Sequence, residues 1–129
     1  MLNNKGQSLV LFVIMLPILV LILVLVIDIG KIILLKQELL NISEIALDYG
    51  LDKIDEEEID TELKNLIKLN KDDIDKINLY IEDEKIYIKL EERYEGVLSG
   101  FIDISIFNVK TGSVGYIENK EKRIERLGD

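Results

Sequence analysis

Carboxylates dominate the side chains with which this sequence could do chemistry. Its 129 residues include 25 Asp and Glu but no His and no Cys. Imidazole acid–base chemistry, thiol nucleophiles, disulfides and thiolate zinc sites are therefore excluded. Paired acids or a serine nucleophile remain, and none of the Ser residues lies in a G-x-S-x-G motif. The sequence thus predicts a protein that is not an enzyme and that binds neither a cofactor nor a small-molecule substrate.

Two acid-rich segments raise the alternative of calcium binding. The first is "DEEEIDTELKNL" from Asp55, and the second is "NKDDIDKIN" from Asn70. A calcium loop of the EF-hand type needs spaced oxygen ligands, a central Gly and a terminal Glu. The first segment lacks that Gly and the second does not fit the spacing, so we predict no metal site. The first segment instead predicts a helix capped by Asp55, with Glu56, Glu57 and Glu58 in its first turn.

The charge balance excludes two classes of partner. The formal net charge is -9, and Lys5 is the only charged residue before Asp28. Residues 28–129 therefore carry 15 Lys and Arg against 25 Asp and Glu, a net charge of -10. Binding of nucleic acid, or of anionic lipid through a polybasic segment, needs clustered cations. We expect neither, and the sequence predicts no nucleic-acid partner.

An uncharged, entirely apolar run extends from Leu9 to Ile27. As a helix, its 19 residues span about 28 Å, close to the roughly 30 Å of a bilayer core. A buried core helix is disfavoured because the run is apolar on every face and the rest of the chain is too small to enclose it. A cleaved signal peptide is disfavoured because the run is long and no A-x-A-like site follows. We expect a transmembrane helix with the lipid bilayer as its partner.

Pro17 lies inside this run and has two interpretations. It removes one backbone donor and favours a kink. It is either a proline tolerated by neighbouring helices or a weak point that lets the helix bend when it joins an assembly. Lys5 before the run and Lys31 and Lys36 after it leave the orientation undecided by charge.

The residues around this run form an ordered pattern. "KGQSLVLFVIMLP" followed by "DIGKIILLKQELLN" resembles the N-terminal region of TadE/TadG-like proteins, which are pilin-like minor components of tight-adherence (Tad, or Flp-type) pilus systems. The resemblance covers about the first fifty residues. The matching positions are Gly6, Gln7, Val10, Phe12, Leu16, Pro17, Asp28, Gly30, Gln37, Leu39 and Asn41.

The resemblance implies a non-enzymatic role in pilus assembly, with other pilin-like subunits or pilus assembly proteins as partners. It implies a cytoplasmic N-terminus, an extracytoplasmic C-terminal domain, and a motif of Asp28 and Gly30 at the membrane boundary. It also makes Gly6 and Gln7 a candidate prepilin-type processing site. Leu11 departs from the pattern, since processed relatives have Glu there before the residue that matches Phe12. Leu11, Phe12 and Pro17 would then decide bending and assembly, and whether the chain is cut after Gly6 stays open.

Helical periodicity continues beyond the apolar run. Ile32, Leu35, Leu39, Ile42, Ala46 and Tyr49 recur every three or four residues, and Gly50 could cap the helix. This stripe needs a partner, which is either the chain's own sheet or the same helix of another pilin-like subunit. A second helix is expected to follow, with an apolar face of Ile59, Leu63, Leu66, Ile67 and Leu69.

The remaining chain alternates between apolar and polar residues. "INLYIEDEKIYIKLEERY" predicts a β-hairpin that turns near Asp83 and Glu84. "GVLSG" predicts a loop or short helical turn, and Phe101 to Val109 another strand. Gly112 and Gly115 predict a turn into a last short strand, after which the charged tail from Asn119 is expected to fray.

The expected fold is α+β and pilin-like: a long N-terminal transmembrane helix continues into a small domain with a second helix and an antiparallel sheet. Residues 1–8 form a short cytoplasmic N-terminus, 9–27 the span, 28–50 the helix extension and 51–129 the extracytoplasmic domain. The predicted function is that of a single-pass cell-membrane protein of a Tad-type pilus. A membrane-anchored interaction subunit of another envelope complex is the alternative.

Overall fold

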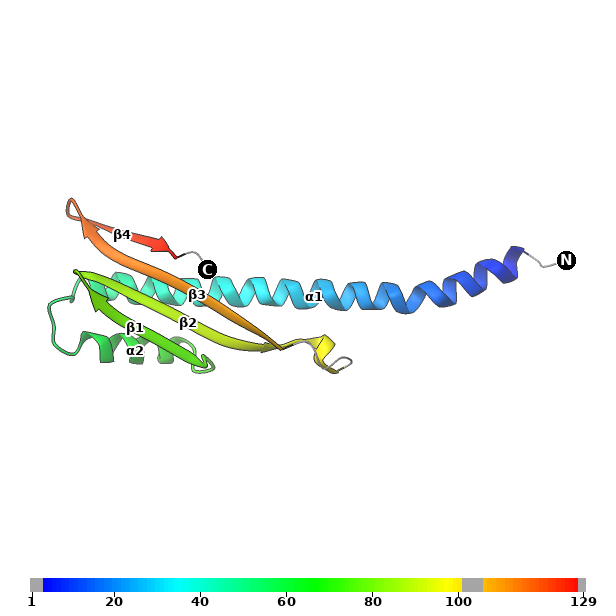
Figure 1. The fold of residues 1–129 in the computed structure, drawn as a ribbon, viewed down its shortest axis with the longest axis horizontal. Helices are drawn as coiled ribbons and strands as arrows, with labels where there is room; N and C mark the ends of the chain where they lie inside the picture. The colour runs from blue at the N-terminus through cyan, green and yellow to red at the C-terminus, as the bar shows by residue number, and fades with distance from the viewer. Residues whose placement is uncertain (1–3, 101–105, 128–129) are drawn as a thin grey trace.

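A single helix, α1, forms the axis of the molecule. The computed structural model describes residues 4–100 and 106–127, and α1 runs from Asn4 to Leu51 without interruption. It is long and apolar enough to cross a membrane. Figure 1 shows that α1 bends in its N-terminal third, where Pro17 lies and removes a backbone donor.

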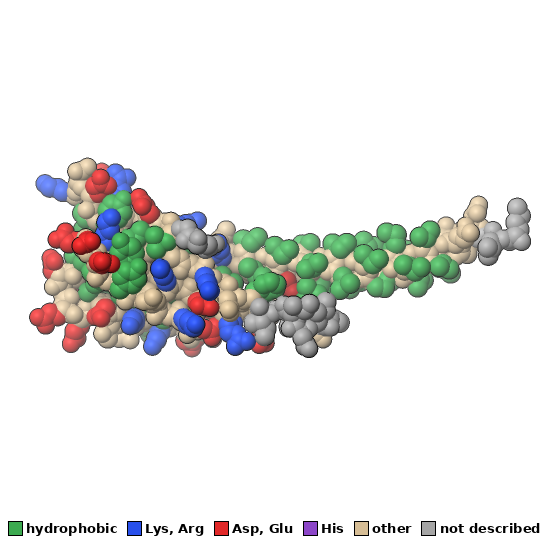
Figure 2. Space-filling model, in the orientation of Figure 1, with side chains coloured by type: hydrophobic (Ala, Val, Ile, Leu, Met, Phe, Trp, Pro, Cys, Tyr) green, Lys and Arg blue, Asp and Glu red, His purple; other side chains and the backbone are tan. Residues whose placement is uncertain are grey.

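The two halves of α1 have different surroundings. Before Asp28 its apolar side chains are exposed apart from the half-buried Val24, and its buried residues begin at Asp28. Figure 2 shows this exposed half as a bare apolar rod, with acidic side chains gathered at the opposite end of the molecule. The second half of α1 packs against the rest of the chain, so one helix belongs to two environments.

Four antiparallel strands form one sheet in the order β1-β2-β3-β4. Their bounds are Lys76–Glu82 for β1, Lys85–Glu95 for β2, Ile106–Glu118 for β3 and Glu121–Arg126 for β4. Two-residue turns join β1 to β2 at Asp83 and Glu84, and β3 to β4 at Asn119 and Lys120. All four turn residues have positive φ, which matches the right-handed twist of a hairpin. The predicted first hairpin and its turn are confirmed.

The core lies between one face of the sheet and two helices. The second helix, α2, runs from Ile59 to Asn70 beside α1 (Figure 1). Alternate residues of β2, namely Ile86, Ile88 and Leu90, point into the core, as their period of two predicts. The other buried members are Leu35, Leu39, Ile42, Ala46, Leu47, Leu51, Ile59, Leu63, Ile67, Leu79 and Val109. The layout is α+β, as expected.

The apolar stripe of α1 is covered by the chain's own sheet and by α2. Leu35, Leu39, Ile42 and Ala46 are buried, and Ile32 packs partly buried against the same core. Of the two partners left open, the chain's own sheet is therefore the one that the structure shows, and the alternative of another subunit is wrong for the four buried side chains. Tyr49 lies off the stripe and is exposed, with its hydroxyl bonded to Lys53.

Three predictions about the helix ends are wrong. Gly50 is not a cap but a buried residue of α1, where an added Cβ would lie 2.8 Å from Leu63 Cδ1. The second helix begins at Ile59 rather than near Asp55, so Glu56 to Glu58 precede its first turn. Leu69 is exposed, whereas Ile59, Leu63 and Ile67 form the buried face. The second helix thus starts at its first buried residue, and the acidic segment before it is exposed.

The C-terminal part also differs from expectation. Gly112 and Gly115 lie inside the long strand β3 rather than in a turn. At Gly115 an added Cβ would lie 3.1 Å from Leu47 Cδ2, so the missing side chain lets α1 approach the sheet. The charged tail is not frayed, because residues 121–126 pair with β3 as β4. "GVLSG" contains the predicted short turn, a 3₁₀ helix η1 at Val97–Gly100. Residues 101–105 lie outside the described residues.

Candidate functional site

Asp28 connects α1 to the turn between β2 and β3. Its Oδ1 accepts hydrogen bonds from the backbone N–H of Val97 at 2.8 Å and from the Tyr94 hydroxyl at 3.2 Å. Its Oδ2 accepts one from the Leu98 N–H at 3.1 Å. Only 2% of Asp28 is exposed. We call this arrangement the Asp28 clasp, and it holds the start of η1 on the side of α1.

Gly96 makes the clasp sterically possible. A Cβ built on Gly96 would lie 2.6 Å from Asp28 Oδ2 and 2.9 Å from Oδ1, well inside van der Waals contact. The carboxylate therefore occupies the space that a side chain would need. Any residue larger than Gly at this position must displace Asp28 or the turn.

The clasp favours the ionised form of Asp28. Burial alone would raise the pKa of this carboxyl group, but the donors Leu98 N–H, Val97 N–H and Tyr94 Oη together lower it below its usual value. The Tyr94 hydroxyl has a raised pKa because it is partly buried and donates to Asp28. Asp28 thus carries its negative charge within the contact between α1 and the turn.

The other residues singled out from the N-terminal pattern are spread along α1. Gly6, Gln7, Leu11 and Phe12 lie in the exposed half of the helix, and nothing lies within 4 Å of where a Cβ on Gly6 would be. Gly30 likewise has open space at its Cβ position, so packing gives no reason for it. Of the predicted boundary pair, Asp28 is built into a structural contact and Gly30 is not.

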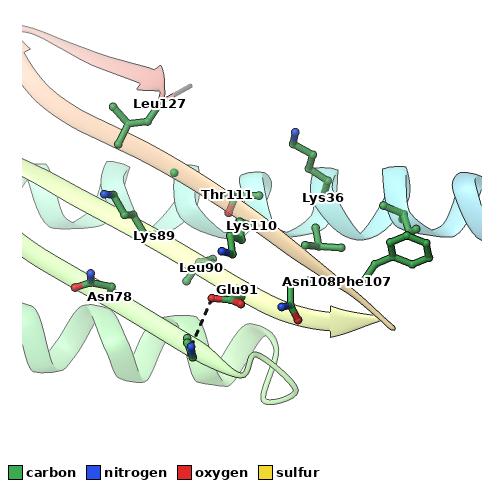
Figure 3. Close-up of a pocket in the computed structure, with 14 residues that line it drawn as sticks. Lys36, Asn78, Lys89, Leu90, Glu91, Phe107, Asn108, Lys110, Thr111 and Leu127 are labelled. Atoms are coloured by element: carbon green, nitrogen blue, oxygen red, sulfur yellow. Dashed lines mark ion pairs between the residues drawn. The ribbon is translucent and has the colours of Figure 1, made fainter. Parts of the chain in front are cut away.

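A cationic groove crosses the sheet near α1. Its volume is about 770 Å³, and it runs from β1 over β2 and β3 to α1 (Figure 3). Four lysines, Lys36, Lys76, Lys89 and Lys110, line it together with Asn78, Asn108 and Glu91. The register explains this, because Lys76, Glu91 and Lys110 form one row across three strands, and Asn78, Lys89 and Gly112 form the next.

The charge of the groove is opposite to that of the whole chain. Its carboxylate, Glu91, is 3.9 Å from Lys76 Nζ, which leaves positive charge in excess among the lining residues. Coulombic attraction would draw an acidic segment or another anion to such a surface. The groove therefore has the charge of a surface that could bind an anion.

Ion pairs at both ends of the domain connect the helices to the sheet. Lys71 Nζ lies 3.3 Å from Glu92 Oε1 and 3.9 Å from both Glu38 and Asp73. Burial is the main cause of a raised pKa at Glu92, and Lys71 offsets it only in part. At the other end, Lys122 Nζ of β4 lies 3.0 Å from Asp48 and 2.9 Å from Asp52. These pairs position elements and are not arranged around a cavity.

Over residues 4–100 and 106–127, no group of three or more acidic side chains is placed to hold a metal ion. Sequence reasoning missed Tyr94, Gly96 and the groove lysines. A lone Gly beside "VLS" carries no signal for the clasp. The groove lysines could have been noticed, since Lys89 and Glu91 alternate with buried residues of β2, but their neighbours across the sheet depend on register.

The comparisons with known proteins add no family. No protein-family model, no curated protein and no solved structure matches the chain.

Proposed function

We propose that this protein is a non-enzymatic, single-pass membrane protein that acts as a pilin-like minor component or assembly factor of a Tad-type pilus system. In this proposal residues 9–27 span the cell membrane, the N-terminus is cytoplasmic and the sheet lies outside. The observation that carries it is the continuity of α1. Its first half is exposed and apolar, and its second half supplies the core of the α+β domain without a break. Such a rod suits a subunit that links a membrane to an external assembly.

The N-terminal pattern supports the pilus system in particular. Gly6, Gln7, Phe12, Pro17 and Asp28 stand in the order found in TadE/TadG-like proteins. Leu11 is exposed on α1 near the start of the proposed span, where a Glu would be less favourable in lipid than Leu. The proposal therefore favours a permanent anchor over a major fibre subunit.

The test is made in the host cell. The gene is deleted and then restored from a plasmid, and surface pili are counted by electron microscopy in each strain. Intact mass and N-terminal sequencing of the membrane-purified protein are measured in parallel. We expect loss of pili on deletion and recovery on complementation. Pili that are unchanged by the deletion would refute the pilus role. A chain beginning at Gln7 would show prepilin-type processing and make the protein able to leave the bilayer for a fibre, and one beginning at Met1 would show a resident anchor.

Pro17→Leu tests whether the bend in α1 matters. We expect normal membrane insertion, because Leu is at least as apolar as Pro, and fewer assembled pili, because the helix loses its preferred point of bending. Ile18→Leu is the matched control, because it introduces the same side chain at a neighbouring exposed position outside the pattern. Full pilus assembly by the Pro17→Leu variant would leave Pro17 as a tolerated proline without a role.

A membrane-anchored interaction subunit of another envelope complex is the second candidate. The cationic groove favours it, since four lysines on an otherwise acidic chain suit an acidic partner. Replacing Lys89 and Lys110 with Ser distinguishes the two candidates. The second candidate holds if deletion of the gene leaves pili intact and the two Lys→Ser changes abolish binding of the acidic partner.

A further inference from the structure

The Asp28 clasp fixes the position of η1 along the axis of α1. Val97 and Leu98 donate directly to the Asp28 carboxylate, at 2.8 and 3.1 Å. If residues 9–27 span the bilayer, as the proposed function requires, their length of about 28 Å nearly fills the hydrocarbon core. Asp28, about 1.5 Å beyond Ile27, then lies at the edge of this core. The start of η1 must lie at the same level, at the boundary between the hydrocarbon core and the lipid headgroups.

Apolar side chains surround this level. Val97 is 42% exposed and Phe107, at the start of β3, is 45% exposed. Figure 3 shows Phe107 beside α1 at the end of the groove. On α1 itself Ile29, Ile33 and Leu34 are exposed beyond Asp28, up to about 9 Å further along the helix. We call these five residues the apolar rim. It extends the apolar surface of the first half of α1 toward the domain, with Lys31 exposed between Ile29 and Ile33.

The charges near the rim suit a lipid surface. Between Asp28 and Glu38 the charged residues of α1 are Lys31 and Lys36, and both are exposed. On α1 the carboxylate at this level, Asp28, is turned inward to its three donors, whereas Glu95 of β2 is exposed beside the turn and must stay on the water side of the interface. Lysines at this depth can extend their ammonium groups to lipid phosphates while their stems stay in the interface.

We propose that the apolar rim is a second membrane contact, in which Val97 and Phe107 of the folded domain are immersed in the lipid interface beside α1. The domain therefore does not swing freely on its helix. It rests on the bilayer with η1 toward the membrane and the hairpin turns at Asp83 and Asn119 away from it. This inference rests on the proposed function, since it requires that α1 span a bilayer.

Tryptophan fluorescence tests the contact, because the chain has no Trp of its own. The full chain is reconstituted into phosphatidylcholine vesicles as the single variants Val97→Trp and Phe107→Trp. Emission is recorded with lipids that carry a nitroxide quencher on the headgroup, and separately with lipids brominated deep in the acyl chain. We expect both variants to emit at short wavelength and to be quenched by the headgroup label more than by the deep label.

Two controls bracket the result. Ile117→Trp lies on the same strand and the same face as Phe107 and is 50% exposed, but ten residues away, or about 33 Å along the strand. We expect it to emit at long wavelength without lipid quenching. Leu21→Trp lies within the predicted span, and we expect the deep label to quench it.

The outcomes separate the two proposals. If Leu21→Trp is quenched while Val97→Trp and Phe107→Trp are not, the second contact is refuted and the anchor stands. If both rim variants emit at short wavelength without quenching, the rim is covered by protein rather than lipid, and the inference fails. If Leu21→Trp is not quenched, the membrane-spanning role itself fails. Circular dichroism of each variant confirms that the fold is retained.

Discussion

The packing of α1 on the sheet can be measured with two leucines of the same helix. Leu39 is 0% exposed and belongs to the core, whereas Leu34, five residues earlier, is 65% exposed. Leu→Ala removes the same three carbon atoms at both positions. Any difference in the free energy of unfolding therefore reports where the side chain lies and not what it is.

The expected loss at Leu39 follows from burial. Three methylene equivalents at about 0.8 kcal/mol each give about 2.4 kcal/mol of lost transfer free energy. Incomplete collapse of the cavity raises the cost of such a change toward about 5 kcal/mol. A small domain has a total stability of only about 5–15 kcal/mol, so Leu39→Ala removes a large part of it. Leu34→Ala should stay within about 0.5 kcal/mol of the wild type.

The assay is urea unfolding of the full chain in a mild non-ionic detergent. Near-ultraviolet circular dichroism follows the stacked rings of Tyr80 and Tyr87, whose centroids lie 4.7 Å apart on the opposite face of the sheet. The Leu39→Ala loss should be independent of protein concentration, because the contact lies within one chain. Equal, small effects at both positions would refute the packing described above. They would favour the alternative that the apolar stripe of α1 packs on a partner subunit.

Three further predictions concern the clasp, a buried acid and the source of the core. Gly96→Ala should destabilise the domain by about 1–3 kcal/mol through overpacking and speed hydrogen exchange at the first amides of η1, whereas Gly100→Ala, with open space at its Cβ, should not. Equal exchange in the two variants would show that the clasp is not tight. For Glu92, burial raises the folded pKa above the ordinary 4.5, so its favourable contribution is complete below pH 4.5 and is lost as the pH rises through the folded value. Glu92→Gln should remove this dependence on pH. In urea titrations the free energy of unfolding of the variant, relative to that of the wild type, should therefore increase as the pH rises above 4.5. A difference that does not change with pH would contradict burial of Glu92 as the cause. Residues 52–129 alone lack six of the fourteen buried residues of the described core cluster. This fragment should show no cooperative thermal transition, whereas residues 28–129 should show one. A sharp transition in the shorter fragment would contradict the prediction.

Regular apolar periodicity made the main elements predictable. The uncharged run and the three-to-four spacing after it predicted α1, and strict alternation predicted β1 and β2. Strand β4 was missed because its residues are mostly charged, with Ile124 as its one apolar side chain. Charged residues are common on edge strands, where they discourage pairing with other chains. Such a strand therefore resembles a solvated tail until its partner β3 is known.

The glycines show a different limit. Gly115 was assigned to a turn because Gly is most frequent there, yet it lies in a strand where Leu47 of α1 takes the space of a side chain. Asp28 was recognised as a boundary residue, but its donors lie 66 to 70 residues further along the chain. Contacts at such separation depend on the register of the whole sheet, which local patterns do not determine.

The long separation between Asp28 and Leu98 also sets an order of events during synthesis. The apolar part of α1 is made first, and the amides that bind Asp28 follow 69 and 70 residues later. If α1 spans a membrane as proposed, Asp28 is until then a solvated charge at the end of the apolar run, and the cost of moving a carboxylate into lipid would keep the helix from sliding deeper. Once β2 and η1 are in place, the same charge is enclosed by its three donors. Under the proposed function the carboxylate would therefore first stop insertion and then fix the position of η1 along α1.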